Sequence, residues 1–233
     1  MKTMIWGHRG YPKKFPENSL QGFRFALSKH IEGIEFDVHL TRDNVPVIIH
    51  DENIQRTTNG SGFVGQFSLS ELKKFKLSNG ESIPTLDEFL SLVSYHDVHL
   101  NLEFKTDIIN YYGIEEIVLN KVNNYKLRYP IIYSSFNLKT LRKCYSISNK
   151  ENYCYLTKWP ILHPQEFINR EHLSGLHLHF YQKIPHNIIE RIWTVNSISE
   201  AIMLFNKHVD GIFTNDFITM SIIRNNVFKN ENP

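Results

Sequence analysis

Short β-rich runs alternate with helical patterns along most of this 233-residue chain, and this alternation limits its fold more than any single motif. Repeated βα units build parallel sheets with helices outside. Eight runs are strand candidates: 4–8, 34–40, 99–104, 131–135, 153–156, 176–180, 191–195 and 211–213. Because α/β barrels of about 250 residues form one unit, we expect residues 1–233 to form a single domain.

Four segments depart from the regular alternation. Residues 47–49 look like a strand that returns across the mouth of the sheet. Residues 51–82 are too long for a βα loop and predict a small insertion with one short helix at 68–76. We expect this insertion to form a cap that faces the substrate. Only about ten residues separate the sixth and seventh barrel strands, which predicts an abbreviated crossover with a single turn. The Asn-rich tail, 224–233, is expected to fray.

Composition excludes several classes of protein. Twenty-six Lys and Arg against 24 Asp and Glu give a net charge of +2, so we expect no nucleic-acid partner. The chain has no apolar run long enough for a transmembrane helix, and its first residues lack the pattern of a secretory signal. Two cysteines cannot form a disulfide framework. A cytoplasmic location is the simplest prediction, and homo-oligomerisation stays open.

Acidic residues recur in the same pattern on two predicted strands. Glu35 and Asp37 are two residues apart on one strand and share a face, as Glu103 and Lys105 do on the next barrel strand. Alternating acids are also typical of a solvated antiparallel strand, but their recurrence at two strand ends favours a site. Crowded carboxylates repel one another, and a divalent cation relieves this repulsion. Ligands that are all oxygen favour Mg²⁺ or Ca²⁺.

Two histidines follow strand candidates at the same predicted mouth. His8 ends the first strand and His50 ends the returning one, so the pair can divide the acid and base roles of proton transfer. Arg9 has the geometry to bind a phosphate or a carboxylate. Trp193, near another strand end, fits core packing and pocket lining equally well. The pattern assigns no role to the other histidines.

These residues stand within a longer series of motifs that resembles the glycerophosphodiester phosphodiesterase family. The series runs in order from residue 8 to residue 215 and is specific as a set. Its segments are His8-Arg9-Gly10, Pro16-Glu17-Asn18-Ser19, Gly33–Val38, Thr41–Val47, His50-Asp51, Arg56–Gly60, Ile83–Leu86, Glu103-Phe104-Lys105, Trp193–Asn196 and Asp210–Asn215. Asn18 is a candidate cap for a helix over 19–30, and Ser19, where the family more often has Thr, keeps a capping hydroxyl.

The resemblance implies an α/β fold, a (β/α)8 TIM barrel with the insertion after its second strand. It implies an enzyme that hydrolyses a small-molecule glycerophosphodiester to an alcohol and sn-glycerol 3-phosphate. The roles it implies are a divalent metal, Mg²⁺ or Ca²⁺, on Glu35, Asp37 and Glu103, acid–base catalysis by His8 and His50, and phosphate binding by Arg9 and Lys105. Trp193 is the candidate for a further contact with the substrate.

Three alternatives accompany this interpretation. The same chemistry on a lipid phosphodiester, of the lysophospholipase D type, would use Phe63, Phe67 and Phe75 of the insertion as an apolar channel, although their spacing fits an ordinary small core as well. A non-catalytic barrel that binds metal and phosphate would have little use for two histidines at the mouth. A metal-dependent amidohydrolase barrel would need a metal set rich in histidine, which the sequence lacks.

Overall fold

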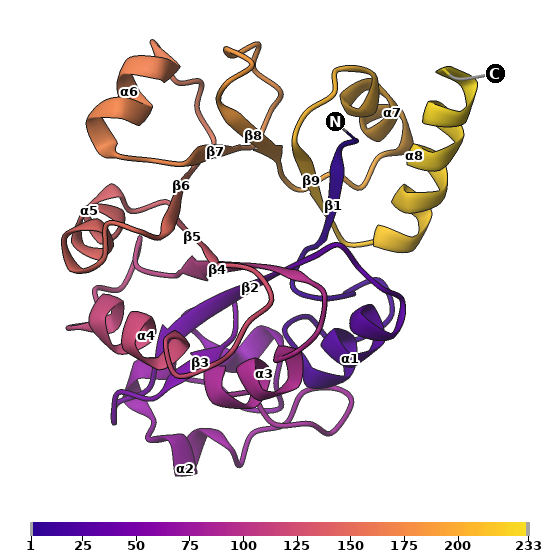
Figure 1. The fold of residues 1–233 in the computed structure, drawn as a ribbon. Coiled ribbons are helices and arrows are strands. Elements are labelled where there is room, and N and C mark those ends of the chain that lie inside the picture. The colour runs from indigo at the N-terminus through magenta and orange to yellow at the C-terminus, as the bar shows by residue number, and fades with distance from the viewer. Residues whose placement is uncertain (1, 232–233) are drawn as a thin grey trace.

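The computed structural model describes residues 2–231, which form a closed parallel β-barrel surrounded by helices (Figure 1). The sheet order is β1-β9-β8-β7-β6-β5-β4-β2, and pairing of β1 with β2 closes it into an eight-stranded TIM barrel. The barrel strands are β1 Met4–Gly7, β2 Gly33–Leu40, β4 His99–Phe104, β5 Ile132–Ser135, β6 Asn152–Thr157, β7 Gly175–Leu178, β8 Ile189–Ile192 and β9 Gly211–Thr214. All eight predicted barrel strands are therefore present.

Helices follow most of these strands and pack their apolar faces on the outside of the barrel. They are α1 Leu20–Ser28, α3 Leu86–Val93, α4 Ile114–Val122, α5 Leu138–Ile147, α6 Pro164–Glu171, α7 Ile198–Asn206 and α8 Phe217–Glu231. Side chains of the preceding residue cap several of them: the Thr85 hydroxyl accepts from the Glu88 N–H, and Glu88 in turn accepts from the Thr85 N–H. Such caps fix where each helix begins relative to the barrel mouth.

Strand β2 is buried along its whole length. Ile34, Phe36 and Val38 join the core between barrel and helices, whereas the alternate residues are the acids predicted to form a site. Gly33 begins the strand beside the ring of Trp6, where an added Cβ would lie 2.4 Å from a ring atom. Glycine is therefore required there, and it lets β2 approach β1 closely enough to close the barrel.

The segment after β2 forms a small unit with its own apolar core. Strand β3 (Pro46–Ile48) pairs antiparallel with β2, as predicted, and is followed by the 3-10 turns η1 (Ile54–Arg56) and η2 (Val64–Gln66) and by α2 (Leu69–Leu72). Helix α2 is shorter than the predicted 68–76. The buried cluster of the whole unit consists of Val47, Ile49, Ile54, Val64, Leu72, Leu77 and Ile83, with Phe67 and Phe75 packed against it. Phe67 and Phe75 thus support a small core, whereas Phe63, the third residue of the proposed apolar channel, is exposed and lies outside this cluster.

The crossover from β7 to β8 is abbreviated, as the sequence predicts. Residues 179–188 contain no helix, and the connection closes with one turn in which the Ile188 N–H donates to the Pro185 carbonyl. The Gln182 side chain substitutes for helical packing: its amide oxygen accepts from the Ile161 N–H at 3.0 Å and its amide nitrogen donates to the Ile161 carbonyl at 2.7 Å. This wall of the mouth is therefore held by polar contacts to the preceding loop.

The C-terminal segment departs from the prediction of a frayed tail. Helix α8 continues from Phe217 to Glu231, and residues 232–233 lie outside the described part of the chain. Arg224 is buried, and its guanidinium donates to both carboxylate oxygens of Glu32 and to the Thr3 carbonyl, each at 2.6 Å. The prediction failed because the Asn-rich composition gave no sign of this ion pair beneath the barrel.

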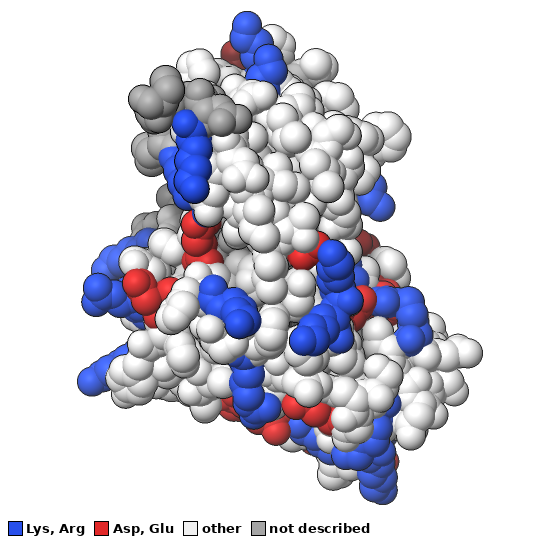
Figure 2. Space-filling model, turned by 90° about the vertical axis from the view of Figure 1, so that its right-hand side faces the viewer, with Lys and Arg blue, Asp and Glu red and all other residues white. Residues whose placement is uncertain are grey.

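The face that carries the C-terminal helix has charges of both signs. On it, basic side chains lie beside acidic ones, as the small net charge leads one to expect (Figure 2). Within the described residues, no helix is both long enough and apolar enough to span a bilayer.

Candidate active site

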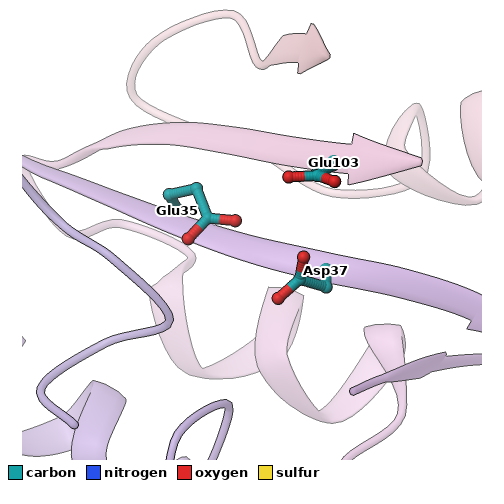
Figure 3. A group of neighbouring side chains, drawn as sticks. All are labelled: Glu35, Asp37 and Glu103. Atoms are coloured by element: carbon teal, nitrogen blue, oxygen red, sulfur yellow. The ribbon is translucent and has the colours of Figure 1, made fainter. Parts of the chain in front are cut away.

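Three carboxylates meet at the carboxyl end of the barrel. Glu35 and Asp37 come from β2 and Glu103 from β4, and β-pairing sets Asp37 opposite Glu103. Their side chains point toward one another (Figure 3), with one oxygen of each within 4.8 Å of the others. All three are buried, and Asp37 has no exposed surface. The structure thus brings together the acids that the alternating pattern singled out.

The electrostatics of this cluster are those of a cation site. Burial, followed by the charges of Asp37 and Glu103, raises the pKa of Glu35 well above its ordinary value. Burial also raises the pKa of Glu103. One oxygen each of Glu35 and Asp37 is buried without a hydrogen-bond partner. Buried carboxylate oxygens that lack donors fit a hard divalent cation, which would pair them and relieve their mutual repulsion.

Two cations flank the carboxylates. The Arg9 N–H donates to Glu35 at 2.8 Å, and the Arg9 guanidinium lies 3.4 Å from Asp37. Lys105 donates to Glu103 at 2.8 Å, and its ammonium is 4.0 Å from Asp37. Although burial opposes it, the charge of Arg9 and then those of His50 and Lys105 keep the pKa of Asp37 low. Two fixed positive charges therefore lie beside the acidic cluster.

His8 is held as a neutral imidazole. Burial, reinforced by the charge of Arg9, lowers its pKa to about 4. Its Nδ1 lies 2.7 Å from the amide oxygen of Asn215, so Nδ1 carries the proton and Nε2 keeps a lone pair. Asn215 follows β9, the last barrel strand. A neutral imidazole fixed in this tautomer is suited to accept a proton.

His50 has a different environment on the other side of the cluster. Its Nδ1 donates to Asp51 at 2.6 Å, and the Lys105 ammonium lies 3.2 Å from its Nε2. Although partial burial opposes it, hydrogen bonds from Arg56 and His50 lower the pKa of Asp51 to about 2. Asp51 therefore stays ionised at neutral pH and holds the His50 ring in place through its Nδ1.

Several positioning residues were missed in the sequence. His39 has no exposed surface; its Nε2 donates to the His50 carbonyl at 3.0 Å, and Tyr111 lies 2.8 Å from its Nδ1. Asn18 does not cap α1. The hydroxyl of Ser19 does, accepting from the Gly22 N–H, while the Asn18 amide donates to Asp37. The only sequence signal for His39 is its place on the acidic face of β2.

A pocket of about 80 Å³ opens above these groups. Its wall includes both histidines and Glu103, together with Phe136 and Trp193, which meet edge to face at 5.3 Å between ring centroids. Trp193 donates to the His177 carbonyl at 3.0 Å, so it lines the pocket and is also anchored to a neighbouring strand. None of the lining residues belongs to 51–82. The insertion therefore does not line this pocket, contrary to the expectation of a substrate-facing cap, and reaches the site only through the contact of Asp51 with His50 and the ion pair of Arg56 with Glu17.

A closed eight-stranded βα barrel with a buried polar cluster at the carboxyl ends of its strands has the architecture of a TIM-barrel enzyme. The sequence pattern of the "Glycerophosphoryl diester phosphodiesterase family" matches residues 8–219. This chain belongs to that family, which confirms the resemblance and the predicted class of enzyme.

Relatives and solved structures agree with this membership. A glycerophosphodiester phosphodiesterase of Caldanaerobacter subterraneus is 35% identical over 93% of this chain and 95% of its own length. One of Bacillus altitudinis is 31% identical over 91% and 94% of the two chains. An Oleispira antarctica phosphodiesterase, solved in complex with the product sn-glycerol-3-phosphate, superposes with a TM-score of 0.88 at 26% identity, covering 96% of this chain and 97% of the other.

Proposed function

We propose that this protein hydrolyses glycerophosphodiesters to an alcohol and sn-glycerol 3-phosphate in a reaction that requires a divalent cation. The observation that carries the proposal is a pocket lined by two differently partnered histidines, Arg9, Glu35 and Glu103, with Asp37 and Lys105 in contact with these residues. The product bound to the Oleispira relative supports the same substrate class.

Glu35, Asp37 and Glu103 are the proposed metal ligands, and Mg²⁺ or Ca²⁺ fits their oxygen donors. When bound, the cation supplies positive charge to the phosphoryl oxygens, where negative charge gathers in the transition state. Arg9 and Lys105 bind the phosphate and add two fixed charges within the same buried site. Trp193, in the wall of the same pocket, confines the substrate.

The environments of the two histidines support different proton roles. His8, neutral with a free Nε2, takes the proton of the attacking hydroxyl, and His50, backed by Asp51, gives a proton to the oxygen of the leaving alcohol. One P–O bond forms and the P–O bond to the alcohol breaks. The attacking hydroxyl is either water or the glycerol 2-hydroxyl of the substrate. In the second case a cyclic phosphate forms first and water then opens it, and ³¹P NMR during turnover distinguishes the two routes.

The test is release of glycerol 3-phosphate from glycerophosphocholine and glycerophosphoethanolamine. We expect release to stop with EDTA, to return with Mg²⁺ or Ca²⁺, and to be lost in His50→Ala. His96→Ala is the matched control, because His96 is an exposed histidine outside the pocket. Wild-type kcat in His50→Ala would overturn the assigned role of His50. No release with either metal would overturn the proposed substrate class and turn attention to a monoacyl lipid phosphodiester.

A further inference from the structure

A second hollow adjoins the active-site pocket. This groove of about 210 Å³ shares two wall residues, Phe136 and Leu156, with the pocket and continues between the loops that follow β4 and β6. Asp107, Tyr155 and Trp159 form much of its lining. The pocket, of about 80 Å³, is smaller than the groove and lies over the acidic cluster. If the phosphate of a phosphodiester binds in the pocket, the groove is the adjoining space for one of its two organic groups.

The groove begins where the phosphate is expected. The Lys105 ammonium lies 5.9 Å from the centre of the Phe136 ring, which is the shared wall. Asp107 follows Lys105 by two residues, and its carboxylate is within electrostatic range of the Lys105 ammonium. His50, the proposed proton donor to the leaving oxygen, contacts the same lysine. The groove therefore adjoins the side of the site on which His50 would meet the leaving alcohol.

The lining has the chemistry of a cation site. Trp159 is 79% exposed, an unusual state for the largest apolar side chain, and Tyr155 beside it is half-buried. The Trp159 backbone is held by Thr157, whose hydroxyl accepts from the Trp159 N–H at 2.9 Å and donates to its carbonyl at 3.1 Å. Aromatic faces beside a carboxylate attract alkylammonium groups through cation–π and ionic interactions.

We propose that this groove binds the alcohol of the substrate and that Asp107, Tyr155 and Trp159 select alcohols carrying an ammonium group, such as choline or ethanolamine. The proposal rests on the proposed function, since it concerns the other half of the same phosphodiester. An ammonium group on a short ethyl linker enters the groove past Phe136. Lys158, an exposed residue that also lines the groove, repels an ammonium group and partly offsets the attraction of Asp107.

The experiment compares three substrates: glycerophosphocholine and glycerophosphoethanolamine, whose alcohols are cationic, and glycerophosphoglycerol, whose alcohol is neutral. The readout is the ratio of kcat/KM for each cationic substrate to that for the neutral one. Removing one exposed ionic contact costs about 1 kcal/mol, so Asp107→Asn lowers this ratio about fivefold, through KM. Trp159→Ala lowers it in the same direction. Lys158→Gln raises it, because it removes a repelling charge.

Glu116→Gln is the matched control, since it removes an exposed carboxylate from helix α4 and leaves the ratio unchanged. An unchanged ratio in Asp107→Asn, or an equal fall with all three substrates, would overturn the assignment of the groove while the proposed function stands. If the wild-type protein hydrolyses none of the three, the proposed function fails and the assignment of the groove fails with it.

Discussion

The Asn18 side-chain amide donates a hydrogen bond to the Asp37 carboxylate at 2.8 Å, joining the start of helix α1 to the acidic cluster. Asn18 is buried and has a positive φ of 55°, a conformation that asparagine adopts more readily than most residues. The neighbouring Ser19 caps the helix instead. Asn18 thus orients one carboxylate of the proposed metal site from outside the barrel strands.

This relationship predicts that Asn18→Ala weakens metal binding more than it weakens the fold. Without its donor, Asp37 is less well oriented, and loss of such an outer partner typically costs tenfold or more in metal affinity. The measurement is the Mg²⁺ or Ca²⁺ concentration that restores half of the activity after EDTA. Ser19→Ala is the matched control: losing the cap lowers stability by about 1 kcal/mol but leaves the metal midpoint in place. Equal midpoints in the two variants would refute the role of Asn18.

The acidic cluster is expected to destabilise the metal-free protein. Because burial and neighbouring charges raise the pKa of Glu35, Glu35→Gln removes a repulsion and stabilises the fold in EDTA. A gain of about 1 kcal/mol raises Tm by roughly 2–4 °C in a chain of this size. Addition of Mg²⁺ or Ca²⁺ raises the Tm of the wild-type protein but not that of the variant, because only the wild type binds the ion tightly. Thermal unfolding with and without metal checks both. A lower Tm for the variant in EDTA would contradict the prediction.

The barrel and the charged residues of the site could be predicted because each rests on a local pattern. Strand–helix alternation gave the eight units, and the period of two along 34–40 gave Glu35 and Asp37 a common face. Contacts between distant segments could not be predicted in the same way. Asn215, which fixes the tautomer of His8, is 207 residues away from it in the sequence, and no local pattern links the two.

The groove beside the pocket also depends on such distant contacts. Asp107 and Trp159 follow different strands, and each taken alone is an ordinary loop residue. The insertion shows a different limit: its length and composition predicted a separate unit, but the spacing of its phenylalanines fitted a channel and a small core equally, and only the structure places Phe67 and Phe75 against a core.

The ion pair beneath the barrel predicts a purely structural defect. Arg224→Ala removes three hydrogen bonds from helix α8 and leaves Glu32 without its ion-pair partner, which costs about 2–3 kcal/mol of unfolding free energy. The catalytic kcat is expected to stay at the wild-type value, since Glu32 precedes β2 at the end opposite the acidic cluster. Urea unfolding and steady-state kinetics measure the two effects. Lys2→Ala, which removes an exposed contact to Asn225 on the same helix, is the control and costs little. A fall in kcat for Arg224→Ala would show coupling between the two ends of the barrel.

Glu190, on β8, predicts a pH dependence of stability that is independent of the acidic cluster. Burial, with a contribution from the charge of Asp210, raises its pKa to about 7 from an ordinary 4.5. Between these two pH values the unfolded chain has released the Glu190 proton, whereas the folded chain has kept it. The contribution of Glu190 to the free energy of unfolding is therefore fully present below pH 4.5 and is lost as the pH rises through 7. The shift in the pKa of Glu190 corresponds to a change of at most about 3 kcal/mol in the free energy of unfolding.

Glu190→Gln isolates this contribution because it keeps an acceptor for the Gln182 N–H while removing the titration. In urea unfolding at pH 5 and pH 8, the wild-type protein is expected to lose more free energy of unfolding than the variant does. All other titrating groups are shared by the two proteins, so the difference between them belongs to Glu190 alone. Parallel pH profiles would mean that Glu190 is ionised in the folded protein across this range.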